Sequence, residues 1–117
     1  MIPSGNEKTT GSAPLTVALW TDFQPLLAIA VTPQGVQVLL PLIQEMGGKL
    51  LVPAALAQDL GLTQAVETYD GSLSLALTER WHQQRSLVFA LATGAVVRLI
   101  APLLDSKQID PAVVVVD

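Results

Sequence analysis

The chain has 117 residues, of which 50% are hydrophobic and 14% charged, with a formal net charge of −4. It contains no cysteine, which excludes disulfides and thiolate metal sites, and its six basic residues are scattered, which argues against a nucleic-acid partner. No apolar run approaches the roughly 18 residues of a spanning helix, so we expect no membrane partner either.

The chain begins with a polar stretch. Residues 1–14 are rich in Ser, Thr and Gly, and we expect them to form a disordered tail. They lack the basic start and apolar core of a signal peptide, so a cytoplasmic location is expected. Residues 15–117 are predicted to form a single α/β domain, with a short extended arm at 15–20 as its first segment.

The first strong pattern is a strand followed by a helix. Residues 26–31 are a continuous apolar run, which is typical of a buried strand. Thr32 then supplies an N-cap, Pro33 occupies the first helical position, and the helix is predicted to run to residue 46, where two glycines follow. Pro41 lies inside this helix and should kink it.

The middle of the chain has weaker patterns. A short strand is expected at 49–52, and residues 54–70 contain a short helix at 54–59 followed by turn signals. An amphipathic helix is predicted at 73–84. Its core-facing residues are expected to be Leu73, Leu75, Leu77 and Trp81.

The last third of the sequence predicts a βαβ unit. A strand at 87–92, a helix at 95–104 and a strand at 112–116 follow one another with short turns between them. Together with the earlier elements they predict a three-layer α/β fold, with an open, doubly wound parallel sheet of about four strands and helices on both faces. Because the sequence stops on the last residue of a predicted core strand, we expect the amino-terminal fragment of a longer enzyme.

The helix predicted at 95–104 is apolar around nearly its whole circumference. Its apolar residues are Val96, Val97, Leu99, Ile100, Leu103 and Leu104. A helix on one face of a sheet needs one apolar side, so the surplus is expected to pack against another domain or a second copy of the chain, which predicts a homodimer.

Two turns are candidate binding segments. Thr32 and Gly35 follow the first strand, and Thr93 and Gly94 follow the strand at 87–92. Both turns fall at the carboxyl ends of parallel strands, where open α/β sheets bind ligands, and the free N–H groups of a helix start suit carboxylates or phosphates. Ordinary helix capping explains the same residues without any ligand.

Three charged residues near the end of the chain have more than one interpretation. Arg98 is the single charge in its helix, and it could pair with a substrate carboxylate, with Asp105 or Asp110, or serve an interface. Lys107 and Asp110 flank a tight turn before the final strand, where they could bind substrate or only form the turn.

No catalytic motif is present. His82 is the single histidine, and its neighbours predict a surface residue. There is no nucleophile elbow around a serine, no glycine-rich phosphate loop and no metal-ligand spacing. Catalytic residues are therefore unassigned, and no metal or organic cofactor is expected in this domain.

The block from Leu87 to Asp117 resembles the CbiG family of cobalamin biosynthesis, the cobalt-precorrin-5A hydrolases. The residues that carry the resemblance are Val88-Phe89, Ala92-Thr93-Gly94, Val97-Arg98, Ile100-Ala101-Pro102-Leu103-Leu104, Ser106-Lys107, and Asp110-Pro111-Ala112-Val113 through Asp117. Earlier segments that fit it are Ala28–Thr32 with Gly35, and Gly71-Ser72-Leu73.

The resemblance implies a flavodoxin-like amino-terminal domain of an enzyme that acts on a cobalt-bound tetrapyrrole. Family members open a lactone of this substrate and release acetaldehyde. The implied substrate-binding residues are Thr32, Gly35, Thr93, Gly94, Arg98, Lys107 and Asp110. The family's glycine-rich Ser-Gly-His segment follows the aspartate that matches Asp117 and is not in this sequence, so the catalytic groups are expected outside it.

Some family members are fused to a precorrin-3B C17-methyltransferase, and the Asp22-Phe23-Gln24-Pro25 stretch resembles this fused kind. S-adenosylmethionine would be a cofactor only if such a domain followed. Two functions therefore stay open. The domain could contribute to tetrapyrrole binding, or it could be a non-catalytic scaffold or dimerisation domain that docks the downstream domains of the same chain.

Overall fold

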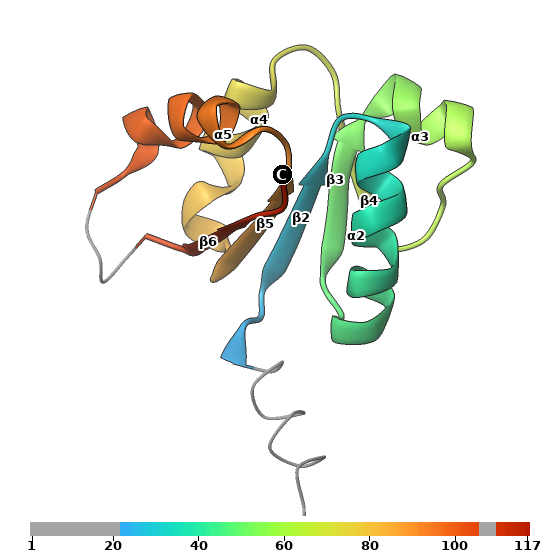
Figure 1. Cartoon of the computed structure of the whole chain (residues 1–117), viewed down its shortest axis with the longest axis horizontal. Helices are drawn as coiled ribbons and strands as arrows, with labels where there is room; N and C mark the ends of the chain where they lie inside the picture. The colour runs from blue at the N-terminus through green and yellow to red at the C-terminus, as the bar shows by residue number, and fades with distance from the viewer. Residues whose placement is uncertain (1–21, 106–109) are drawn as a thin grey trace, which may run out of the picture.

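The computed structural model describes residues 22–105 and 110–117 (Figure 1). The predictions for the tail at 1–14, for the arm at 15–20 and for Lys107 lie outside the described residues.

The centre of the fold is a five-stranded sheet in which every neighbouring pair is parallel. The strands are β2 (Leu26–Ala30), β3 (Lys49–Pro53), β4 (Val66–Tyr69), β5 (Ser86–Ala90) and β6 (Ala112–Val115). They lie in the order β4-β3-β2-β5-β6. Strands β2 and β5 are nearly fully buried and, apart from Ser86, apolar, as expected for strands covered on both faces.

The predicted class of fold is confirmed, with five strands where about four were expected. The additional strand is β4, in the segment for which only a helix and turns were predicted. Counted along the chain, the described strands lie in the order third, second, first, fourth, fifth. Flavodoxin has the order 2-1-3-4-5, and dinucleotide-binding folds contain 3-2-1-4-5. The described strands follow the second of these orders, within the doubly wound class that the sequence predicts.

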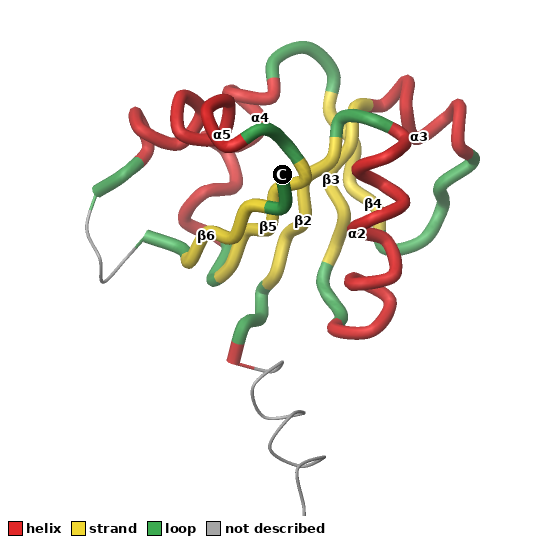
Figure 2. Tube along the Cα trace, viewed as in Figure 1, coloured by secondary structure: helices red, strands yellow, loops and turns green. Residues whose placement is uncertain are grey.

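Helices cover both faces of the sheet, as Figures 1 and 2 show. One face carries α2 (Pro33–Met46) and α3 (Ala54–Leu60), and their apolar residues form one core cluster with the strands. The other carries α4 (Leu73–Arg80) and α5 (Thr93–Ile100), which form a second cluster. Short 3-10 turns, η2 (Trp81–Gln83) and η3 (Ala101–Leu103), extend these two helices. The chain runs from β2 to β4 in one direction across the sheet and then from β5 to β6 in the other. Because crossovers between parallel strands are right-handed, the helices of the two halves cover opposite faces.

The predicted ends of α2 are confirmed. The Thr32 hydroxyl accepts a hydrogen bond from the Gly35 amide at 3.0 Å, Pro33 is the first helical residue, and Gly47 at φ 84° ends the helix. The helix continues through Pro41. Gly48 follows at φ 101°, and a Cβ there would lie 2.5 Å from the Leu26 carbonyl oxygen, so the close approach of β2 requires a glycine.

Two expectations about side chains need correction. Leu75 was predicted to face the core, but it is 67% exposed, whereas Leu77 and Trp81 are buried as predicted. The apolar surplus on α5 is also smaller than the sequence suggests. Val96 is buried and its neighbours Leu99, Ile100 and Leu103 pack against the core, which leaves Val97 and Leu104 exposed.

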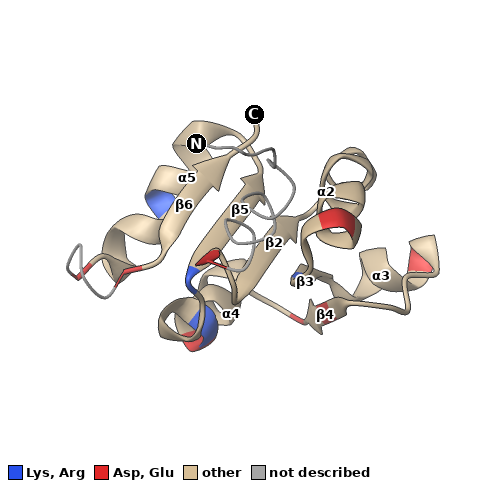
Figure 3. Cartoon of the chain, turned by 90° about the horizontal axis from the view of Figure 1, so that it is seen from below, with Lys and Arg blue, Asp and Glu red and all other residues tan. Residues whose placement is uncertain are grey.

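Charge is sparse on this fold. Arg98 is the basic residue of α5 and β6 is AVVV, in line with the colours of these elements in Figure 3. Among the described residues, no helix is long and apolar enough to cross a membrane.

Candidate functional site

The candidate site lies at the carboxyl edge of the sheet, where β2 and β5 are neighbours. From β2 the chain passes through α2 to β3 on one side, whereas from β5 it passes through α5 to β6 on the other. The two connections leave in opposite directions, and in open α/β sheets this switch point opens a crevice that binds ligands. The turns predicted from sequence, after β2 and after β5, therefore do lie on the two sides of one crevice.

On the α2 side, the crevice is an open hollow of about 380 Å³, here called the α2-side hollow. It is lined by Thr32, Gln34, Gly35, Val38, Ala90, Leu91, Ala92, Val116 and Asp117. Its walls are mainly apolar, with polar groups at the rim. A Cβ on Gly35 would lie 3.1 Å from the Ala30 Cβ and 3.3 Å from the Ala90 Cβ, so Gly35 allows α2 to start directly on the two central strands.

The start of α5 is already bonded within the chain. The Asp117 carboxylate oxygen Oδ2 accepts hydrogen bonds from the Thr93 amide at 3.2 Å and from the Thr93 hydroxyl at 3.1 Å. The residue before α5, Ala92, offers no side-chain cap, so Asp117 supplies it from the end of the neighbouring strand. Thr93 was predicted to bind a substrate anion, and its N–H and hydroxyl are instead directed at this internal carboxylate.

On the other side of Leu91 lies a second open hollow of about 450 Å³, the α5-side hollow, formed between α4, α5 and the end of β2. Its lining is Val31, Leu73, Ser74, Leu91, Ala95, Arg98 and Leu99. Arg98 is exposed at its mouth. Within residues 22–105 and 110–117, no ion pair or hydrogen bond reaches the Arg98 guanidinium. The predicted alternatives of pairing with Asp105 or Asp110 are not formed.

Asp110 lies away from the other predicted site residues. It precedes β6 and is therefore at the amino edge of the sheet, opposite the crevice. Its oxygen Oδ1 accepts a hydrogen bond from the indole N–H of Trp81 at 3.1 Å, and Oδ2 accepts one from the Asp105 amide at 2.7 Å. Asp110 thus ties the buried Trp81 to the turn before β6, in agreement with its interpretation as a turn residue.

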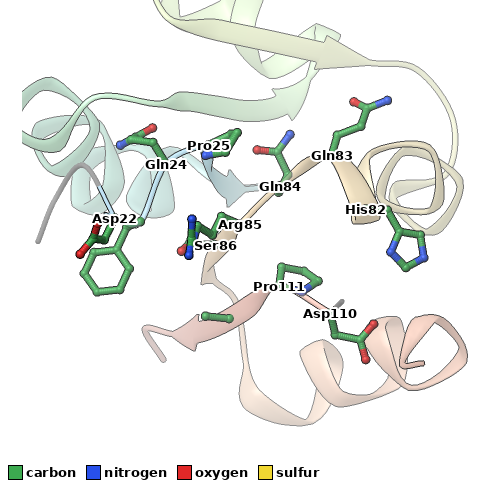
Figure 4. A pocket seen from close by; sticks show the side chains of 12 residues that line it. Asp22, Gln24, Pro25, His82, Gln83, Gln84, Arg85, Ser86, Asp110 and Pro111 are labelled. Atoms are coloured by element: carbon green, nitrogen blue, oxygen red, sulfur yellow. The ribbon is translucent and has the colours of Figure 1, made fainter. Parts of the chain in front are cut away.

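A third hollow was not predicted from the sequence. It lies at the amino edge, measures about 570 Å³, and is here called the amino-edge hollow (Figure 4). His82 is at its rim, exposed as predicted. Ser86, the first residue of β5, also lines it, and the Ser86 hydroxyl is buried with no hydrogen-bond partner among residues 22–105 and 110–117. The sequence feature that could have indicated this hollow is Ser86, the polar residue that begins the otherwise apolar strand at 86–90.

Neither shifted pKa values nor metal ligands identify a catalytic group at the carboxyl edge among the described residues. Burial raises the pKa of the Tyr69 hydroxyl, at the end of β4, above its ordinary value of 10.0. Among the described residues, no group of three or more His, Cys, Asp and Glu side chains could hold a metal ion.

The matched region includes β5, α5 and β6. The family model described as cobalamin synthesis G N-terminal matches residues 75–117. Residues 75–117 therefore resemble a CbiG amino-terminal domain. This match confirms the resemblance drawn from the sequence, and it includes Thr93, Gly94 and Arg98 but not Thr32 or Gly35.

Two curated relatives agree with this match. A cobalt-precorrin-5A hydrolase of Priestia megaterium is 41% identical over 54 residues, which are 46% of this chain and 14% of the relative. The enzyme of the same name from Salmonella typhimurium is 41% identical over 49 residues, 42% of this chain and 14% of the relative. The chain thus matches about one seventh of the length of these relatives. No solved structure matches the chain.

Proposed function

We propose that this chain is a CbiG-type amino-terminal domain that contributes tetrapyrrole contacts to a cobalt-precorrin-5A hydrolase of cobalamin biosynthesis. The observation that carries the proposal is the position of the matched region. Residues 75–117 supply β5, α5 and β6, which form one whole side of the crevice at the switch point. The names of the two relatives supply the substrate.

The geometry favours one residue for substrate binding. Arg98 is exposed beside the α5-side hollow, and no described group neutralises it. A guanidinium can grip a carboxylate with two parallel hydrogen bonds, and a cobalt-precorrin carries several carboxylates. The apolar walls on both sides of Leu91 suit the body of a large ring. The α5 amino terminus is a weaker candidate because Asp117 already occupies its first N–H group.

The reaction would still need groups that this chain does not supply. No hydrogen bond between the described residues joins a nucleophilic side chain to a general base. His82 lies at the opposite edge of the sheet from the crevice. We therefore assign binding and positioning of the substrate to this domain and leave the acid–base chemistry to other parts of a longer enzyme.

The test is a titration of the chain with cobalt-precorrin-5A, followed by its visible spectrum, together with an assay for acetaldehyde. A saturable spectral shift without acetaldehyde is expected. Arg98→Ala should weaken binding about tenfold or more, since a charge-assisted pair contributes about 1.5–3 kcal/mol. Lys49→Ala is the matched control, because it removes a surface cation that lies 3.8 Å from Glu67 at the amino edge. Equal binding by the wild type and Arg98→Ala would remove Arg98 from the site.

A scaffold role is the second candidate, and exposed apolar side chains favour it. Val97 on α5 and Leu104 after η3 are 55% and 57% exposed. In this case the domain would dock other domains or a second copy, including a fused methyltransferase. It predicts concentration-dependent association in sedimentation velocity, reduced by Val97→Asp, and no spectral shift with the tetrapyrrole.

A further inference from the structure

The amino-edge hollow is a separate feature from the crevice, because it lies at the opposite ends of the same strands. It is formed where the segment before β2, the turn before β5 and the turn before β6 come together. In Figure 4, Arg85 and Ser86 lie between the Asp22–Pro25 segment and Pro111. With about 570 Å³ it has the size of a small-molecule site.

Ser86 carries the argument. The residue is 4% exposed, and its hydroxyl is buried with no hydrogen-bond partner in the part of the chain that the structure describes. Buried polar groups in folded proteins are almost always bonded, so an unbonded hydroxyl in a residue that lines a hollow is a candidate contact for a molecule bound there. The backbone around it is already satisfied: the amides of Arg85 and Ser86 both donate to the Pro25 carbonyl, and the Ala112 amide donates to the Arg85 carbonyl.

Arg85 supplies the second group. Its side chain is exposed at this hollow, and within the described part of the chain no carboxylate pairs with it. The two acids that line the hollow do not neutralise it. Asp110 accepts hydrogen bonds from Trp81 and from the Asp105 amide, and Asp22 is exposed. A cation and a hydroxyl next to each other in sequence thus have hydrogen-bonding capacity that the fold leaves unused.

We propose that the amino-edge hollow binds a small monocarboxylate, held by the Arg85 guanidinium and the Ser86 hydroxyl. The guanidinium fork matches the two oxygens of a carboxylate, and the hydroxyl donates a further hydrogen bond to one of them. Asp22 and Asp110 on the rim disfavour anions of higher charge, so phosphate should bind more weakly. This site is independent of the tetrapyrrole site proposed above, since it uses none of its residues.

The test uses the 117-residue chain labelled with nitrogen-15 and titrated separately with sodium propionate and with inorganic phosphate at constant ionic strength. Propionate should give saturable chemical-shift changes at the amides of Ser86 and Ala112. Ser86→Ala and Arg85→Gln should each weaken this binding at least fivefold. Lys49→Gln is the control, because it removes another cation at the amino edge that does not line the hollow, and it should bind propionate as the wild type does.

Three outcomes would overturn the proposal. Shifts that rise linearly without saturation would indicate bulk ion effects and leave a water molecule as the partner of Ser86. Equal affinity in the wild type and in both folded variants would remove Arg85 and Ser86 from the site. Tighter binding of phosphate than of propionate would contradict the monocarboxylate assignment. None of these results depends on the outcome of the cobalt-precorrin titration.

Discussion

The two edges of the sheet satisfy their polar groups in different ways. At the carboxyl edge, where ligands were expected, the polar side chains of the two turns bond within the chain: Thr32 caps α2, and Asp117 bonds Thr93. At the amino edge, where Asp110 was a predicted substrate contact, the Ser86 hydroxyl is buried and bonds to no described residue. The comparison teaches that a helix start beside a crevice is not by itself an unoccupied anion site, whereas an unused buried group is informative wherever it lies.

The largest expected effect tests how tightly the carboxyl edge is built. Gly35→Val should lower the free energy of unfolding by about 1–3 kcal/mol, because the added atoms would press on Ala30 and Ala90. Gly94→Val is the matched control at the start of α5, where a Cβ would meet only the Arg98 Nη1 at 3.6 Å, and should change stability by less than about 0.5 kcal/mol. Urea denaturation of both variants measures the difference. Equal losses would show that the contact at Gly35 is not limiting.

Much of this architecture was predictable from local patterns. The apolar runs of β2 and β5, the Thr32-Pro33 helix start and the glycines after α2 each fix their own element, and they agree with the structure. The alternation of strands and helices then left the doubly wound class as the expected fold.

The parts that escaped prediction depend on contacts between distant segments. The short strand β4 is half polar, and it is positioned by pairing with β3 and by an ion pair of Glu67 with Arg80 at 2.9 Å. The bond between Asp117 and Thr93 joins residues 24 positions apart. Whether the Ser86 hydroxyl finds a hydrogen-bond partner depends on the three separate segments that surround it. The hydrophobic periodicity of the sequence reflects local structure and predicts none of these three features.

The amino edge can be tested by a change that should stabilise the fold. Ser86→Ala removes a buried hydroxyl that bonds to none of the described residues, and it should raise the free energy of unfolding by about 1 kcal/mol when no ligand is present. Ser74→Ala, at an exposed position on α4, is the control and should stay within about 0.5 kcal/mol of the wild type. Thermal unfolding in a buffer without carboxylates measures both. A loss of stability in Ser86→Ala would mean that the hydroxyl is already satisfied, and the contrast between the edges would fail.

The smallest expected effect concerns the carboxylate at the start of α5. Asp117→Asn keeps a hydrogen-bond acceptor but removes the charge from the positive end of the helix dipole, so it should cost about 0.5–1 kcal/mol at low ionic strength. This cost should shrink in 1 M salt, where the Debye length falls to about 3 Å. Asp59→Asn is the charge-matched comparison of opposite sign, because Asp59 lies in the last turn of α3 at the negative end of its dipole, so this substitution should cost no stability.

A salt-independent cost for Asp117→Asn would show that hydrogen-bond geometry, and not charge, holds the end of β6 against α5. No cost at all would mean that the α5 amino terminus is available to a ligand after all. In that case the carboxyl edge would offer an anion two sites, this helix start and Arg98, and Thr93 would return as a candidate substrate contact.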